Sequence, residues 1–172
     1  SSDLLAEVRK GFSHGITLMR DYYQDEAIVV IYELTDMLAR KLRQSRAAAF
    51  TVSLSLRFSK REDPPSFSKS TSLYSATNLS KTLYTACIHL LSQAPAHAAI
   101  RHISVGVTNM VHQDAIQVDL FDGIHHQKLY RLGMATDHII HEHGMSAIMR
   151  ASSLTSAGTW LDRALKLGGH YE

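Results

Sequence analysis

The chain has 172 residues, of which 45% are hydrophobic and 20% are charged, and it carries a formal net charge of +2. This composition indicates one folded domain with room for an appendage, and it excludes an intrinsically disordered chain. No apolar run approaches the roughly 20 residues of a membrane-spanning helix, and the single cysteine, Cys87, cannot form an internal disulfide. We therefore expect a cytoplasmic protein without a membrane partner.

The chain begins Ser1-Ser2-Asp3, without a methionine, and its first thirteen residues show no clear periodicity. We interpret residues 1–13 as a linker from a missing upstream domain.

The first expected elements are a short strand at residues 15–21 and a long helix that starts at Gln24 and stops near Ser45. Asp25 and Glu26 fall in its first turn, where negative charge favours the helix dipole. Apolar residues recur at steps of three and four, which is typical of a helix with one buried side. The members of this stripe are Ile28, Ile31, Leu34, Thr35, Leu38 and Leu42.

From residue 49 to residue 59 the period changes to two, as in a strand with one apolar and one polar side. The apolar side is Phe50, Val52, Leu54, Leu56 and Phe58, and the polar side is Thr51, Ser53, Ser55, Arg57 and Ser59. A turn at residues 60–66, which contains two adjacent prolines, leads to a second strand at residues 67–74. This pattern predicts a hairpin.

Thr77 and Asn78 are expected to cap a second helix at residues 79–93, and another strand follows at residues 101–108. The order is then strand, helix, strand, strand, helix, strand. It predicts an α+β fold in which a four-stranded sheet carries two helices on one face, within a domain at residues 14–112.

Two further segments follow this domain. Residues 113–125 are expected to form a loop, and residues 126–172 a C-terminal extension. Within the extension we predict a helix at residues 127–143 that ends at Gly144, followed by a tail.

Positive charge is concentrated in residues 40–81, where nine Lys or Arg side chains stand against only Glu62 and Asp63. Such a stretch is typical of a surface that binds a polyanion, because neutralised phosphates release counterions. The outward side of the sheet would add hydroxyl groups, which commonly contact nucleic-acid backbones. The alternative is a solvated surface without a ligand.

The pentapeptide Gln117-Val118-Asp119-Leu120-Phe121 is a candidate docking peptide. A glutamine that offers a donor and an acceptor, followed by a Leu-Phe anchor, suits a partner with a hydrophobic pocket and exposed backbone groups. The alternative is a strand end whose Leu120 and Phe121 pack into the core.

No catalytic motif is evident: there is no nucleophile motif, no glycine-rich phosphate loop and no pair of acids for two-metal chemistry. His138, His141 and His143 cluster in the predicted third helix. Zinc needs three or four converging ligands, so we interpret these histidines as exposed helical residues. We expect no catalytic residue, metal site or cofactor in this chain.

Taken together, these segments resemble the little-finger domain of a Y-family translesion DNA polymerase of the UmuC-like (ImpB/MucB/SamB) branch. Four stretches carry the resemblance, namely residues 15–22, residues 33–43, the alternating strand at residues 52–59, and residues 117–121. Residues 150–154 with the later glycines resemble the C-terminal extension found in Gram-positive bacteria and their mobile elements.

The resemblance implies a non-catalytic domain whose sheet binds duplex primer-template DNA independently of sequence. The implied DNA contacts are Arg20, Thr51, Ser53, Ser55, Arg57, Lys60, Lys69, His102 and Ser104. It also implies that Gln117, Val118, Asp119, Leu120 and Phe121 dock on a bacterial sliding clamp, with Val118 in place of the more usual leucine. Nucleotidyl transfer, and the Mg²⁺ it needs, would belong to the parent polymerase.

Two alternatives remain open at this stage. A free-standing RNA-binding module would also have a four-stranded sheet backed by helices, but such modules stack bases on outward-facing aromatic side chains, and Phe50 and Phe58 are expected to face inward. The other alternative is a small metal-dependent enzyme built around His138, His141 and His143.

Overall fold

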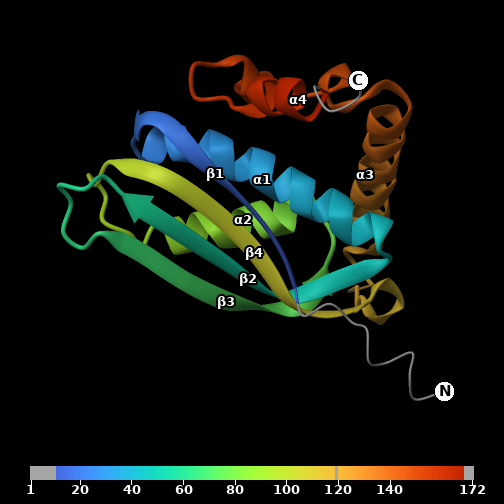
Figure 1. Cartoon of the computed structure of the whole chain (residues 1–172). Coiled ribbons are helices and arrows are strands. Elements are labelled where there is room, and N and C mark those ends of the chain that lie inside the picture. The colour runs from blue at the N-terminus through green and yellow to red at the C-terminus, as the bar shows by residue number, and fades with distance from the viewer. Residues whose placement is uncertain (1–10, 119, 169–172) are drawn as a thin grey trace, which may run out of the picture.

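A computed structural model describes residues 11–118 and 120–168 of the chain. Four strands form one antiparallel sheet, and the order across the sheet is β1-β4-β2-β3. The strands are β1 (Gly11–Tyr22), β2 (Ala47–Phe58), β3 (Ser66–Thr77) and β4 (Ile100–His112). Helices α1 (Gln24–Gln44) and α2 (Ser80–Leu91) cover one face of the sheet (Figure 1). The predicted α+β fold is therefore confirmed.

Helix α1 has the expected bounds, but its buried side is rotated slightly from the predicted stripe. Ile28 is 37% exposed, whereas Ala27 and Val30 are fully buried. The reason is geometric, because a step of 3.6 residues allows two neighbouring stripes, and only the packing of α1 on the sheet selects between them.

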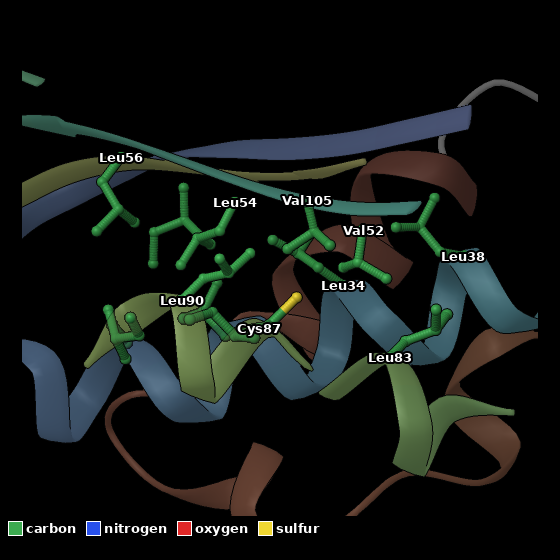
Figure 2. Close-up of a cluster of buried hydrophobic side chains, with 14 of the residues drawn as sticks. Leu34, Leu38, Val52, Leu54, Leu56, Leu83, Cys87, Leu90 and Val105 are labelled. Atoms are coloured by element: carbon green, nitrogen blue, oxygen red, sulfur yellow. The ribbon is translucent and has the colours of Figure 1, made fainter. Parts of the chain in front are cut away.

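The core lies between the sheet and the two helices, as Figure 2 shows. Val52, Leu54 and Leu56 of β2 point toward the helices and are at most 2% exposed. Each such aliphatic side chain contributes about 1.5–3 kcal/mol when it leaves water. Cys87 of α2 belongs to this core, and burial raises the pKa of its thiol to about 12.

Some predicted boundaries were wrong. Strand β1 begins at Gly11 rather than at residue 15, so residues 11–13 are strand and not linker. Helix α2 begins at Ser80 after Leu79, without a side-chain cap. Thr77 Oγ1 accepts a hydrogen bond from the Leu79 backbone N–H, while Asn78 is buried. Thr77 is instead the last residue of β3, and α2 has no side-chain cap from either Thr77 or Asn78.

Phe50 also departs from the prediction, because it is half-buried and is not part of the core cluster. The register between β2 and β3 shifts between Ala49 and Thr51, on either side of this residue. Such an irregularity re-aims a side chain relative to strict alternation. Phe58, by contrast, is buried as expected.

The C-terminal extension contains more structure than the predicted helix and tail. Helix α3 (Gly123–His143) begins inside the expected loop, and a further helix, α4 (Trp160–Gly168), follows it. Two short 3₁₀-helices, Met145–Ala147 and Ala151–Leu154, lie between them. In Figure 1 this extension lies beyond α1, on the side away from the sheet.

Several polar contacts fasten the extension to α1. The Arg43 guanidinium binds the Asp137 carboxylate through two hydrogen bonds, Nε–Oδ2 at 2.7 Å and Nη2–Oδ1 at 2.9 Å, and both side chains are buried. Arg150 binds Asp36 in the same two-pronged manner, at 2.6 and 2.9 Å. Glu33 accepts hydrogen bonds from the start of α4. The extension is therefore packed against the domain.

Candidate nucleic-acid interface and docking peptide

The face of the sheet opposite the helices carries aligned rows of small polar side chains. Each row runs across all four strands and takes one residue from each. In the order β1, β4, β2, β3 the rows are Gly11–Thr108–Thr51–Ser72, Ser13–Gly106–Ser53–Ser70, Gly15–Ser104–Ser55–Ser68 and Thr17–His102–Arg57–Ser66. We call this set the outer face. Its side chains are exposed or half-buried.

Three side-chain hydrogen bonds involve hydroxyls of the outer face. Ser55 Oγ and Ser68 Oγ are 2.8 Å apart, and Asn109 Nδ2 donates to Thr51 Oγ1 at 2.8 Å. Thr17 Oγ1 lies 3.0 Å from His102 Nδ1. Each hydroxyl has two acceptor lone pairs and one donor, so these groups retain capacity to bind phosphate oxygens or water.

Two glycines leave room for neighbouring side chains on the outer face. A Cβ atom at Gly106 would lie 2.7 Å from Ser53 Oγ, and one at Gly15 would lie 3.1 Å from His102 Nε2. Both positions therefore lack the space that a side chain needs without a shift of the neighbour. The absence of a side chain at these two positions allows the backbone of a ligand to approach closely.

His102 and Arg57 are paired across β4 and β2 on the outer face. Burial lowers the pKa of the His102 imidazole, and the nearby Arg57 guanidinium lowers it further. The imidazole is thus neutral at pH 7. Among the sixteen positions of the four rows, Arg57 is the one side chain with a permanent positive charge.

Six of the nine predicted DNA contacts lie together on the outer face, namely Thr51, Ser53, Ser55, Arg57, His102 and Ser104. Lys60 follows in the exposed hairpin turn. Arg20 and Lys69 lie elsewhere. Arg20 pairs with Glu26 of α1 and donates to the Ser156 carbonyl at 3.3 Å. Lys69 pairs in register with inward-facing Leu54, and its ammonium donates to Gln93.

The basic stretch does not form one surface. Arg43 is buried in its ion pair with Asp137, and Arg40 and Lys41 face the extension on the helix side of the sheet. The basic residues of positions 40–81 are therefore divided between the outer side of the sheet and the helix side, and polyanion binding stays a prediction. Charge along a sequence does not report which side of α1 or of the sheet each side chain occupies.

Sequence reasoning missed part of the outer face. Strand β3 contributes Ser66, Ser68, Ser70 and Ser72, and β1 contributes Ser13 and Thr17. The signal was present in the alternation of serine with other residues from 66 to 72. It could have been found by applying the same period-two rule that identified β2.

The candidate docking peptide lies in the segment between β4 and α3. Leu120 is 97% exposed and Phe121 is 94% exposed, so the alternative in which both pack into the core is wrong. Gln117 is exposed, and Val118 is 39% exposed. Asp119 lies outside the described residues. Both apolar side chains are therefore accessible to another molecule, and the docking role stays a prediction.

The metal-enzyme alternative gains no geometric support. The described part of the chain has no group of three or more His, Cys, Asp or Glu side chains that could hold a metal ion. Asp137, next to the histidine cluster, is engaged by Arg43. Within the same part of the chain, no helix is both long and apolar enough to cross a bilayer.

A four-stranded antiparallel sheet with two helices on one face and a polar outer face makes this an α+β domain. Residues 9–120 match the impB/mucB/samB family C-terminal domain. Because this match covers more than half of the chain, the chain belongs to the impB/mucB/samB family. The recognition made from the sequence is confirmed.

Several curated proteins are similar to the chain. It is 34% identical over 166 residues to "DNA polymerase IV 2" of Bacillus subtilis, covering 95% of this chain and 40% of that protein. It is 32% identical over 160 residues to the "Putative UV-damage repair protein UvrX" of the same organism, covering 92% of this chain and 38% of that protein. The chain thus spans about 40% of the length of the curated relatives it matches.

A solved structure, "Complex of beta-clamp processivity factor and little finger domain of PolIV", aligns with 64% of this chain and 97% of that one. The TM-score is 0.47 and the sequence identity is 15%.

Proposed function

We propose that this chain is the sequence-independent DNA-binding and clamp-docking domain of an error-prone translesion DNA polymerase that acts in DNA damage tolerance. The observation that carries the proposal is the outer face, where six of the predicted contacts lie in aligned rows on a solvent-accessible sheet. Nucleotidyl transfer and its Mg²⁺ would belong to the remaining part of the longer protein.

The chemistry of the outer face supports contacts to the phosphate backbone rather than to bases. Serine and threonine hydroxyls donate to phosphate oxygens, and Arg57 adds a permanent positive charge. Such contacts hold a duplex without reading its sequence. A polymerase domain that follows any template needs this property.

The RNA-binding alternative receives less support from the same face. His102 is the only ring among the sixteen positions of the four rows, whereas RNA-recognition sheets stack bases on aromatic side chains. Phe58 is buried, and Phe50 is half-buried beside an irregular stretch of sheet. A preference for single-stranded RNA over duplex DNA in direct competition would favour this alternative.

A titration with duplex primer-template DNA at rising salt tests the DNA-binding role. Affinity should fall steeply with salt, and Arg57→Ala should reduce the slope of log affinity against log salt by about one. Arg131→Ala, which removes an exposed arginine from α3, serves as the matched control and should leave the slope unchanged. Affinity that does not depend on salt would contradict the proposal.

A further inference from the structure

A cavity of about 620 Å³ lies between α1 and the C-terminal extension, away from the outer face and from the docking peptide. Its walls come from the C-terminal half of α1, the start of α2, helix α3, and the segment from Met145 to Trp160. Cavities of about 300–1,000 Å³ are typical of ligand sites. Neither proposed contact with DNA or with a clamp uses this cavity.

The charge of the cavity is positive because its acids are already neutralised. Asp36 is paired with Arg150 and Asp137 with Arg43. The three other cations that line the cavity are Arg40, Lys41 and Lys81, and none of them makes an ion pair within the described residues. A ligand of this cavity should therefore carry negative charge.

Arg40 has an unsatisfied donor. Its Nε is buried and has no hydrogen-bond partner among the residues that the structure describes. Buried polar groups are nearly always hydrogen-bonded, and each exception calls for an explanation. A carboxylate brought to the Arg40 guanidinium would provide an acceptor, because this pairing is commonly two-pronged.

The apolar part of the wall is built from flexible side chains. Met37, Met145 and Met149 line the cavity together with Leu132 and Ile140. Methionine has an unbranched, polarizable side chain that adapts to different apolar partners, and it is common at surfaces that bind peptides. The wall therefore suits a large aliphatic or aromatic side chain.

Stacking of a nucleobase is disfavoured at this site. The Tyr32 ring is stacked on Tyr84, with 3.9 Å between centroids, and the Arg150 guanidinium lies 3.7 Å from the Tyr32 centroid. Two groups this close must occupy opposite faces of the ring. Trp160 is buried, and its indole N–H donates to the Met145 carbonyl. Neither ring offers a free face, so the chemistry favours a peptide over a nucleotide.

From these features we propose that the cavity binds an acidic peptide segment of a partner protein, with a carboxylate at Arg40 and a large apolar side chain against the methionines. The partner would bind on the helix side of the domain, leaving the outer face accessible. The extension would then serve as an adaptor for an accessory protein.

The test uses the whole chain and a phage-displayed library of random peptides of about twelve residues. Enriched peptides should place Asp or Glu beside Leu, Met or Phe. A synthetic, tryptophan-free copy of the best one should change the emission of Trp160, the single tryptophan of the chain, which lines the cavity. Duplex DNA should not compete with it.

Two charge reversals locate the site. Arg40→Glu should weaken the peptide about tenfold or more, because it turns an attraction into a repulsion. Lys81→Glu should also weaken binding of the peptide. This variant should fold normally, since an acid in the first turn of α2 favours the helix dipole. Lys128→Glu, exposed on α3 but outside the cavity wall, is the matched control.

The proposal is overturned by any of three results. These results are a library that yields no enrichment above background, enriched peptides that lack acidic residues, and cavity variants that both bind the peptide as tightly as the wild type does. A Trp160 response to nucleotides but not to peptides would also reject it. These results would leave the DNA-binding and clamp-docking proposals untouched, because those depend on other surfaces.

Discussion

The Arg43 guanidinium of α1 and the Asp137 carboxylate of α3 form a buried, two-pronged ion pair between residues 94 positions apart in the sequence. Arg43 Nη1 also donates to the Asn78 carbonyl at 2.9 Å. Arg43 therefore connects the sheet domain to its extension, because it binds both Asp137 of α3 and Asn78, which lies between β3 and α2.

Asp137→Ala should lower the free energy of unfolding by about 3–5 kcal/mol, because it leaves the Arg43 charge buried without its partner. Urea denaturation followed by circular dichroism measures this change. Asp21→Ala is the matched control, since Asp21 pairs with Arg101 at the surface, where such pairs contribute about 0–1 kcal/mol. Equal effects of the two substitutions would contradict the structural role of the buried pair.

Glu33→Ala should detach α4 from α1. The Glu33 carboxylate is buried and accepts hydrogen bonds from the Thr159 backbone N–H, the Thr159 hydroxyl and the Trp160 backbone N–H. Buried donors left without an acceptor cost about 1–3 kcal/mol each. We expect a red shift of Trp160 emission and faster proteolysis of the extension. Asp25→Ala, an exposed change on the same helix, should have neither effect.

Leu120→Ala combined with Phe121→Ala should abolish binding to a bacterial sliding clamp, while duplex DNA affinity and unfolding free energy stay unchanged. Anchor residues of such interfaces commonly lose about 2 kcal/mol or more on truncation, and both side chains are more than nine-tenths exposed in this chain. Surface plasmon resonance with immobilised clamp measures the loss. Met19→Ala removes a similarly exposed apolar side chain from β1 and should bind normally. Full clamp binding by the double variant would reject the docking role.

Duplex DNA affinity should increase as pH falls from about 7.5 to about 5.5, because protonation of His102 adds a positive charge to the outer face. The folded-state pKa of His102 lies below its ordinary value of 6.5, owing to burial and then to Arg57. The stability of the protein without DNA should change in the opposite direction as pH falls. The unfolded chain binds the proton more readily, so this contribution to stability is present above pH 6.5 and is lost as pH falls toward the folded-state pKa.

His102→Gln is the variant that isolates this effect. It keeps a polar side chain on the outer face but cannot titrate, so the increase in affinity at low pH should shrink. The salt dependence of binding should also become the same at both pH values. An identical pH profile for the wild type and His102→Gln would show that another group is responsible.

Much of the fold could be predicted because periodicity reports how an element is oriented toward its own core. The alternation in β2 predicted that Val52 and Leu54 are buried and that Ser53 and Ser55 face outward, as observed. The candidate docking peptide is likewise a local feature, because the pattern that predicts it consists of consecutive side chains. Its exposure needed the structure, since Leu120 and Phe121 are as compatible with a core as with a surface.

The sequence by itself determined the order of strands and helices within the sheet domain, the polar side of β2 and the family. Only the tertiary structure decided that Lys69 turns toward Gln93, that Arg43 is buried, and that the extension encloses a cavity with α1. The physical reason is that these features depend on contacts between distant segments, such as the 126 residues that separate Glu33 from Thr159. Local periodicity carries no information about which distant residues a side chain will contact.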